Sequence, residues 1–170
     1  MLNIRKSEKK DINELLGIFD EARMTIARLG IDQWQNGYPS RDVIEEDISA
    51  GQSYACELDG KLVGTFVILT DGEPSYDAIF DGKWRTGDGR NYLAIHRVAI
   101  RVASRGTGIS SAIIAYAKNL AKEMGRASLR IDTHEGNAVM RRMLEKNGFE
   151  YCGNIFLETG DIRVAYEKVI

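Results

Sequence analysis

The chain has 170 residues, of which 44% are hydrophobic and 28% are charged, and its formal net charge is −2. A chain of this length and composition is expected to form one globular domain over residues 1–170, with a substantial core. The near-neutral charge argues against a protein that binds nucleic acid through bulk positive charge. The longest apolar run, residues 62–69, is far shorter than the roughly 20 residues of a membrane span, and the N-terminus carries no apolar signal region. We therefore expect neither a nucleic-acid partner nor a membrane partner.

The two cysteines of the chain, Cys56 and Cys152, are distant in sequence and lie in apolar runs typical of strands. Neither has neighbours at the spacing of a metal site, so we expect no bound metal. Buried free thiols are typical of a reducing compartment, and we therefore expect a cytoplasmic protein.

Apolar periodicity and chain breakers predict the order of the secondary structure. Ser40 is a suitable N-cap for a helix, and Asp59-Gly60 between two apolar runs is typical of a two-residue hairpin turn. Residues 70–90 are rich in glycine, proline and aspartate, which indicates a long loop of the kind that often serves as a functional lid. In chain order we expect a strand at 2–6, a helix at 9–29, a helix from Ser40 to Gly51, strands at 53–58 and 61–69, the long loop, a strand at 91–100, a helix at 106–124, a strand at 127–133, a helix at 137–146, and strands at 149–157 and 161–169.

The most informative stretch is Arg105-Gly106-Thr107-Gly108-Ile109-Ser110, which joins an apolar strand to a helix. A glycine-containing turn at a helix N-terminus leaves backbone N–H groups without partners, and the helix dipole favours negative charge there. This arrangement predicts a phosphate-bearing cofactor near residue 106. The helix that follows carries an apolar stripe at Ile109, Ile113, Ala117, Leu120 and Met124, with Ala121 beside it.

Two phosphate-binding patterns fit this loop poorly. A Walker-type loop needs a lysine followed by serine or threonine, which is absent. A dinucleotide fingerprint would be matched by Gly106 and Gly108, but Ser111 takes the place of its third glycine. Asp132, at the end of the next strand, is placed like a ribose-binding acid. That fingerprint normally opens a doubly wound domain, however, whereas this one comes after the middle of the chain.

A third pattern accounts for more of the sequence. Residues 105–110 resemble the acetyl-CoA pyrophosphate loop of the GNAT N-acetyltransferase superfamily, R/Q-x-x-G-x-G/A, with Ser110 at the last small position. Residues 137–149 resemble the second signature of that family, an Asn-led helix ending in E-K-x-G-F. The order of elements also resembles the family, and the loop at 31–39 resembles one bacterial subgroup.

The resemblance implies an α/β fold of the α+β type. Its mixed, mostly antiparallel sheet would have six or seven strands, about four flanking helices, and a cleft at a splayed parallel strand pair. It implies acetyl-CoA-dependent N-acetyl transfer by direct attack of a primary amine on the thioester, with a small-molecule or peptide amine as acceptor. Homodimers are common in the family. The cofactor residues that it implies are Val98, Ala99 and Ile100 for pantetheine, Arg105, Gly106, Thr107, Gly108, Ile109 and Ser110 for the pyrophosphate, and Asn137 for the cofactor arm, where N-capping is an alternative role.

Acyl transfer to an amine needs a base that takes up a proton. The candidates are His96, Asp132 and His134, although each also has a plain structural role open to it: a buried histidine, a turn acid and a solvated loop residue. Many family members carry a tyrosine that protonates the departing thiolate, and here that position is Leu144. Tyr166 is a candidate replacement, and unassisted departure of the thiolate is also chemically acceptable.

Aromatic residues mark the segments that build the acceptor pocket in this family. Trp34, Tyr38 and Trp84 could stack on an apolar acceptor or anchor their own loops. The main alternative function is a non-catalytic acyl-CoA-binding sensor or regulatory module, which the loss of the tyrosine at Leu144 would favour.

Overall fold

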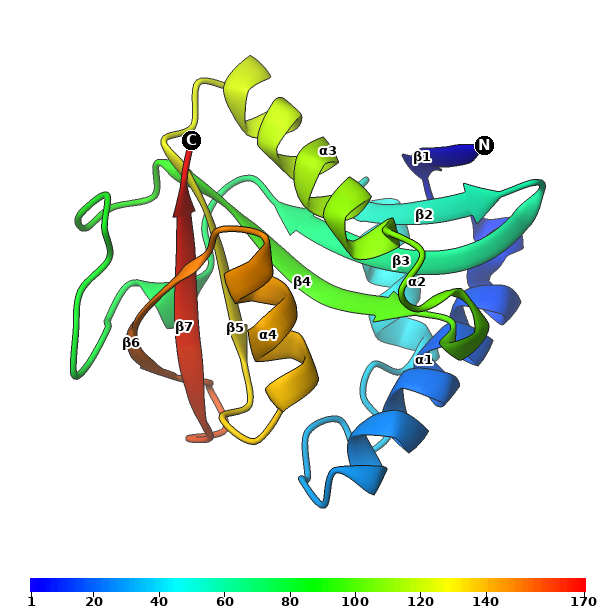
Figure 1. Cartoon of the computed structure of the whole chain (residues 1–170), viewed down its shortest axis with the longest axis horizontal. Coiled ribbons are helices and arrows are strands. Elements are labelled where there is room, and N and C mark those ends of the chain that lie inside the picture. The colour runs from blue at the N-terminus through cyan, green and yellow to red at the C-terminus, as the bar shows by residue number, and fades with distance from the viewer. The chain divides into compact units, whose positions relative to one another are not determined.

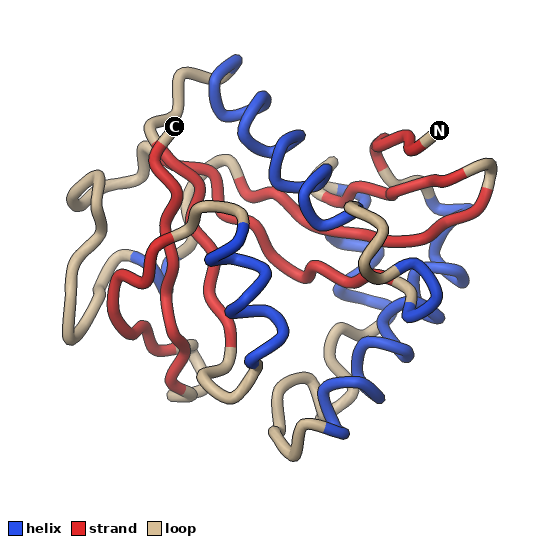
Figure 2. The backbone as a smooth tube through the Cα atoms, viewed as in Figure 1, coloured by secondary structure: helices blue, strands red, loops and turns tan.

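The computed structural model describes all residues from Met1 to Ile170 and combines seven strands with four α-helices (Figures 1 and 2). Three short 3-10 turns, η1 to η3, complete it. In chain order the elements are β1 (Leu2–Lys6), η1 (Lys9–Asp11), α1 (Ile12–Arg28), α2 (Arg41–Ser49), β2 (Ser53–Leu58), β3 (Lys61–Leu69), η2 (Pro74–Tyr76), β4 (Tyr92–Ile100), η3 (Val102–Ser104), α3 (Ile109–Glu123), β5 (Ser128–Thr133), α4 (Ala138–Lys146), β6 (Glu150–Phe156) and β7 (Ile162–Val169).

The strands form one seven-stranded sheet in the order β1-β2-β3-β4-β5-β7-β6. The pairs β1–β2, β2–β3, β5–β7 and β6–β7 are antiparallel. The exception is β4 beside β5, a parallel pair in which Tyr92–Ala94 faces Ser128–Arg130. Both strands continue beyond this short ladder, so their later backbone groups do not pair with each other. The expected mixed, mostly antiparallel α/β fold is confirmed.

The chain divides into two compact units. The first unit consists of Met1–Ile68 and Arg97–Ile113, and the second consists of Leu69–His96 and Ile114–Ile170. Strand β4 and helix α3 each contribute residues to both units.

In the first unit an apolar cluster joins α1 and α2 to strands β2, β3 and β4. The side chain of Ser40 accepts a hydrogen bond from the Val43 N–H, so α2 begins with the expected N-cap. The hairpin turn at Asp59 and Gly60 has positive φ at both residues, as the sequence predicts for its two-residue type. The buried members of the cluster are Ile12, Leu15, Ile18, Phe19, Ala22, Ile44, Ala55, Leu62 and Ala99.

The second unit has an aromatic core that encloses a buried ion pair. The Arg130 guanidinium lies 3.0 Å from a carboxylate oxygen of Glu167, and both side chains are almost fully buried. The rings of Trp84 and Tyr92 each lie 4.2 Å from the guanidinium carbon, and their π faces stabilise the cation. Ser128 donates a further hydrogen bond to Glu167, so the buried carboxylate is well satisfied.

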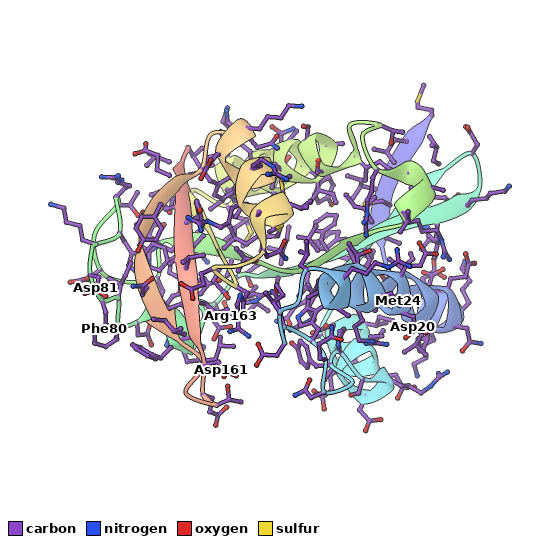
Figure 3. All side chains as sticks on the ribbon, turned by 60° about the horizontal axis from the view of Figure 1, so that its bottom comes forward. Asp20, Met24, Phe80, Asp81, Asp161 and Arg163 are labelled. Atoms are coloured by element: carbon purple, nitrogen blue, oxygen red, sulfur yellow. The ribbon has the colours of Figure 1, made fainter.

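The segment between β3 and β4 is fastened to the edge strand β6. Phe80 and Asn154 exchange two backbone hydrogen bonds of 2.8 Å each, and Figure 3 labels Phe80 together with its neighbour Asp81. At Gly153 a Cβ atom would lie 2.6 Å from the Phe80 carbonyl oxygen, and at Gly82 it would lie 1.9 Å from the Cys152 carbonyl oxygen. The two backbones therefore approach each other as closely as only glycine allows.

The sequence-based element boundaries hold with a few differences. Helix α3 begins at Ile109 rather than 106, because Gly106 and Gly108 have positive φ and form a turn outside the helix. Met124 was expected in the apolar stripe, but it follows the last residue of the helix and is 41% exposed. Both cysteines are free and buried. No helix is long and apolar enough to cross a membrane.

Candidate functional site

The turn at residues 105–110, in the first unit, presents a row of backbone N–H groups. No group of the protein accepts a hydrogen bond from the N–H groups of Gly106 to Ser110, and Gly106, Thr107 and Gly108 are exposed. The positive φ angles of the two glycines, 77° and 88°, turn the chain into the first turn of α3. Free N–H donors at the start of a helix form a favourable site for an anion.

Helix α1 braces this turn from one side. The Glu21 carboxylate accepts hydrogen bonds from the Arg101 guanidinium (2.7 Å) and from the Val102 N–H (2.9 Å). These bonds lower the pKa of Glu21, the Val102 N–H being the largest contribution. The Arg105 guanidinium donates to the Thr25 hydroxyl at 3.0 Å. The cation of Arg105 therefore stays exposed while its side chain is held beside the turn.

Arg97 interrupts β4 with a conformation that is rare for a residue with a side chain. Its φ of 49° lies in the left-handed region. The guanidinium forms a two-pronged ion pair with Asp47, with N–O distances of 2.8 and 2.6 Å, and donates to the Tyr38 hydroxyl at 2.5 Å. Burial opposes the charge, but these partners outweigh it and raise the pKa of Arg97. The irregularity in β4 directly before Val98, Ala99 and Ile100 is thus held by α2 and the loop before it.

His96, the preceding residue of β4, faces a different carboxylate. Its Nε2 atom lies 3.2 Å from a Glu73 oxygen, and the two side chains are 18% and 19% exposed. The two groups are not aligned for a hydrogen bond, and Nε2 is buried without any other partner. Burial tends to raise the pKa of Glu73, but the contact with His96 and the Ser75 N–H outweigh burial and lower it to about 2.

Asp132 is held by a tyrosine of the second unit. The Tyr76 hydroxyl donates to Asp132 Oδ1 at 2.6 Å, and its ring stacks on the His96 imidazole at 5.8 Å with 20° between the planes. Burial, followed by the charge of Asp132, raises the pKa of Tyr76. The structure therefore brings His96, Asp132, Tyr76 and Glu73 into one group, of which the sequence had singled out the first two as bases.

His134 and Asn137 lie in the turn between β5 and α4. Strand β5 ends at Thr133, so His134 does not continue it. His134 Nδ1 accepts a hydrogen bond from the Gly136 N–H at 2.9 Å. The Asn137 side chain accepts from the Met140 N–H at 3.1 Å and is the N-cap of α4, the structural role that the sequence left open.

The two positions considered for protonating the thiolate differ in polarity. Leu144 is fully buried in α4 and contributes to the core. Tyr166 in β7 is also fully buried, and its hydroxyl accepts a hydrogen bond from Arg141 Nε at 3.0 Å. The hydroxyl proton of Tyr166 is not used in a hydrogen bond within the protein, so it remains available for donation.

The three aromatic residues expected at the acceptor pocket all have structural partners. Trp34 packs edge-on against Phe19 of α1, with ring centroids 5.8 Å apart, which anchors its loop. Tyr38 is fixed by Arg97. Trp84 is buried and its Nε1 donates to the Tyr76 carbonyl at 3.0 Å. Contact of these residues with an acceptor stays a prediction.

Two residues of these networks were not identified from the sequence as site residues. Glu73 lies in the segment at 70–90 that the sequence predicts to be a long loop, yet Pro74 after it is typical of the start of a helical turn and indicates a fixed side chain. Arg97 is a charged residue inside the otherwise apolar run of β4, which is a signal for a buried partner.

Comparisons with known proteins identify the family. A family model described as "Acetyltransferase (GNAT) family" matches residues 21–149. The chain belongs to this family. An acetyltransferase of the GNAT family from Streptococcus agalactiae is 36% identical to it; the alignment covers 99% of this chain and 95% of that chain, with a TM-score of 0.85.

More distant structures share the fold of this GNAT protein. A GNAT-family acetyltransferase from Listeria monocytogenes is 23% identical, covers 99% of this chain and 95% of its own, and has a TM-score of 0.72. The PaiA N-acetyltransferase from Thermoplasma acidophilum, solved in complex with coenzyme A, is 17% identical, covers 100% of this chain and 99% of its own, and has a TM-score of 0.73. No curated protein matches the chain.

Proposed function

We propose that this GNAT protein is an acetyl-CoA-dependent N-acetyltransferase that acts on a primary amine of a small molecule or peptide. The observation that carries the proposal is the row of free N–H groups from Gly106 to Ser110 at the start of α3. Membership of the acetyltransferase family supports it, as does the distant Thermoplasma relative that binds coenzyme A. Residues 1–170 would form one catalytic domain. Its free, buried cysteines are consistent with the reducing cytoplasm.

The residues of the first unit fit a cofactor that carries a pyrophosphate. The N–H groups of residues 106–110 would hold the pyrophosphate oxygens, and the exposed Arg105 would add a cation. Because β4 leaves its ladder with β5 after Ala94, we propose that the backbone of Val98–Ile100 pairs with the amides of pantetheine. Asn137, the N-cap of α4, would approach the cofactor arm.

In the reaction, the amine nitrogen would attack the thioester carbon directly while the carbon–sulfur bond breaks. A base must take up the amine proton, and His96 and Asp132 are the candidates whose remaining atoms are free for it. His134 fits less well because its Nδ1 already accepts from Gly136. The Tyr166 hydroxyl would supply a proton to the thiolate. Orientation of the amine, rather than a covalent enzyme intermediate, would provide most of the rate.

The glycine turn offers a sharp test of cofactor binding. Gly108 and Gly160 both have φ of 88° and open space where a Cβ would lie. Each glycine-to-alanine substitution should therefore cost a similar amount, about 1 kcal/mol. Only Gly108→Ala should redirect the N–H groups of the pyrophosphate turn. We expect acetyl-CoA and CoA, but not NAD, to raise the melting temperature of the wild type and of Gly160→Ala, and to raise that of Gly108→Ala much less. Equal responses of the two variants would contradict the assignment of the turn.

A panel of amines separates the enzyme from a binding module. Leu144, where many relatives have tyrosine, is the feature that favours a module without catalysis. The proposed function predicts release of free CoA when acetyl-CoA is mixed with at least one amine, detected with a thiol reagent. Binding of CoA without turnover across amino acids, polyamines and peptide N-termini would favour the sensor.

A further inference from the structure

Glu73 differs from the other acids of the segment between β3 and β4. Asp77 is exposed and pairs with Arg90, and Asp81 accepts a hydrogen bond from the Asn154 side chain. Glu73 is instead largely buried, and one of its carboxylate oxygens lies 3.2 Å from His96 Nε2. Its position therefore needs an explanation other than solvation of a loop.

Two further hydrogen bonds hold Glu73 in place. The Glu73 backbone N–H donates to the Tyr92 hydroxyl at 2.9 Å, and its carboxylate Oε1 accepts from the Ser75 N–H at 3.1 Å. The second oxygen, Oε2, is then left facing His96. Because these bonds already order Glu73, holding its carboxylate beside the imidazole costs little further conformational entropy.

The charge of Glu73 determines which imidazole nitrogen carries a proton. The pKa of Glu73 is lowered to about 2, so the group is an ion at neutral pH and can only accept hydrogen bonds. The buried Nε2 of His96 has no other partner, so the 3.2 Å contact with this carboxylate favours a proton on Nε2. In the neutral imidazole the lone pair is then on Nδ1, which makes no hydrogen bond within the protein.

Tyr76 contacts both the His96 imidazole and Asp132, the other candidate base. Tyr76 stacks on the imidazole, and its hydroxyl binds Asp132 Oδ1. Glu73 thus contacts Nε2 of His96 and Tyr76 contacts the ring face, while Asp132 is reached through the Tyr76 hydroxyl and Tyr92 through the Tyr76 ring.

We propose that Glu73 is a positioning residue that holds the Nε2 proton of His96 and stabilises the imidazolium, so that Nδ1 takes up the proton of the acceptor amine. The inference rests on the proposed function for its catalytic part. The amine nitrogen forms the bond to the acyl carbon, the carbon–sulfur bond breaks, the thiolate carries away the electron pair, and the amine proton passes to Nδ1. Glu73 itself touches no reacting atom.

The pairing can be measured without any substrate. The chain has two histidines, so the ring nitrogens can be observed by 15N NMR and assigned with His134→Gln. In the neutral ring of wild-type His96 the proton should lie on Nε2, and in Glu73→Gln the fraction with the proton on Nδ1 should rise, because an amide attracts the Nε2 proton less than a carboxylate does. The matched control is Asp77→Asn, which removes a carboxylate from the same loop and should leave the distribution of the proton unchanged. An unchanged distribution in Glu73→Gln would overturn the pairing.

Kinetics then test the catalytic part. With acetyl-CoA and an accepted amine, Glu73→Gln should lower kcat on the order of tenfold and leave the KM for acetyl-CoA unchanged. Asp77→Asn should match the wild type. A changed proton distribution with unchanged kcat would overturn the role of Glu73 in catalysis. Failure of the proposed function is distinguishable, because the wild type itself would then release no CoA.

Discussion

His96 and Arg97 are neighbours in β4, and each meets a carboxylate from another part of the chain, but the two pairs are built differently. Arg97 and Asp47 make two aligned hydrogen bonds, and Tyr38 adds a third to the guanidinium. His96 and Glu73 meet in a single contact of 3.2 Å without hydrogen-bond alignment. Three N–H donors of the Arg97 guanidinium are used in hydrogen bonds, whereas Nδ1 of His96 makes none.

One strand therefore carries a residue that holds its backbone, Arg97, beside the residue that the proposed function uses as a base, His96. A buried guanidinium keeps its charge at any ordinary pH, and the bonds of Arg97 to Asp47 and Tyr38 hold the backbone of residue 97 at its unusual φ. An imidazole beside one fixed carboxylate can still gain and lose a proton. The following predictions test that contrast, beginning with the largest expected effect.

Removing the carboxylate of the Arg97 pair should destabilise the protein most. In Asp47→Asn the buried guanidinium keeps its charge and loses its counter-ion, because the two side chains are only 14% and 10% exposed. We expect the free energy of unfolding in urea at pH 7 to fall by about 3 kcal/mol. A loss below 1 kcal/mol would mean that the pair does not hold β4.

Glu73→Gln should lower the free energy of unfolding by an amount that depends on pH. The pKa of Glu73 is about 2 in the folded protein and is lowered from 4.5, so its ionised form stabilises the fold above pH 4.5 and that contribution is lost as the pH falls through 2. Urea unfolding of wild type and variant should therefore differ by about 2 kcal/mol at pH 6, allowing for partial solvent exposure. The difference should shrink as the pH falls toward 2. A difference that is constant with pH would contradict the ionic origin.

Two tyrosine-to-phenylalanine variants separate the structural network from the catalytic one. Tyr38→Phe removes an acceptor from Arg97, and Tyr76→Phe removes a donor from Asp132, so each should cost about 1 kcal/mol in urea unfolding. If His96 is the base, Tyr76→Phe should keep kcat within about threefold, a change of under 1 kcal/mol in the barrier. A much larger loss of kcat in Tyr76→Phe would point to Asp132 as the base.

Removing an exposed ion pair should change the free energy of unfolding least, and it serves as the reference for the buried pairs. Asp20 of α1, labelled in Figure 3, is 67% exposed and pairs with Arg23. Asp20→Asn should change the free energy of unfolding by no more than about 0.5 kcal/mol, since solvent screens the pair. A loss comparable to that in Asp47→Asn would show that burial is not what distinguishes the Arg97 pair.

The fold was largely predictable because its local signals agree with its packing. The turn at Asp59-Gly60 predicts the pairing of Leu58 with Lys61, although a bulge between Cys56 and Glu57 shifts the register beyond it, and Ser40 predicts the start of α2. The start of α3 was missed by a few residues, since helical periodicity does not reveal that Gly106 and Gly108 adopt positive φ. Such boundaries depend on backbone angles rather than on side-chain pattern.

Sequence reasoning could propose residues for the site but not their pairings. It named His96, on the strand before the glycine turn, and Asp132, near the end of the next strand, because their side chains suit proton transfer. It could not find that Glu73 faces one and Tyr76 the other, because both partners come from a long loop whose path has no periodic signal. Likewise, the partner of Arg97 lies in α2, far along the chain, and only the folded sheet brings them together.

The close approach of the Phe80 segment to β6 protects the protein against association through its sheet edge. β6 is an outermost strand of the sheet, and an exposed edge invites pairing with the edge of another copy. The backbone of Phe80 occupies the hydrogen-bonding positions of Asn154, and Gly82 and Gly153 let the chain lie directly against the strand. A Cβ at either glycine would lie closer than 3 Å to the opposite backbone, so a side chain at either position would displace this cover and leave the β6 edge unpaired at Asn154.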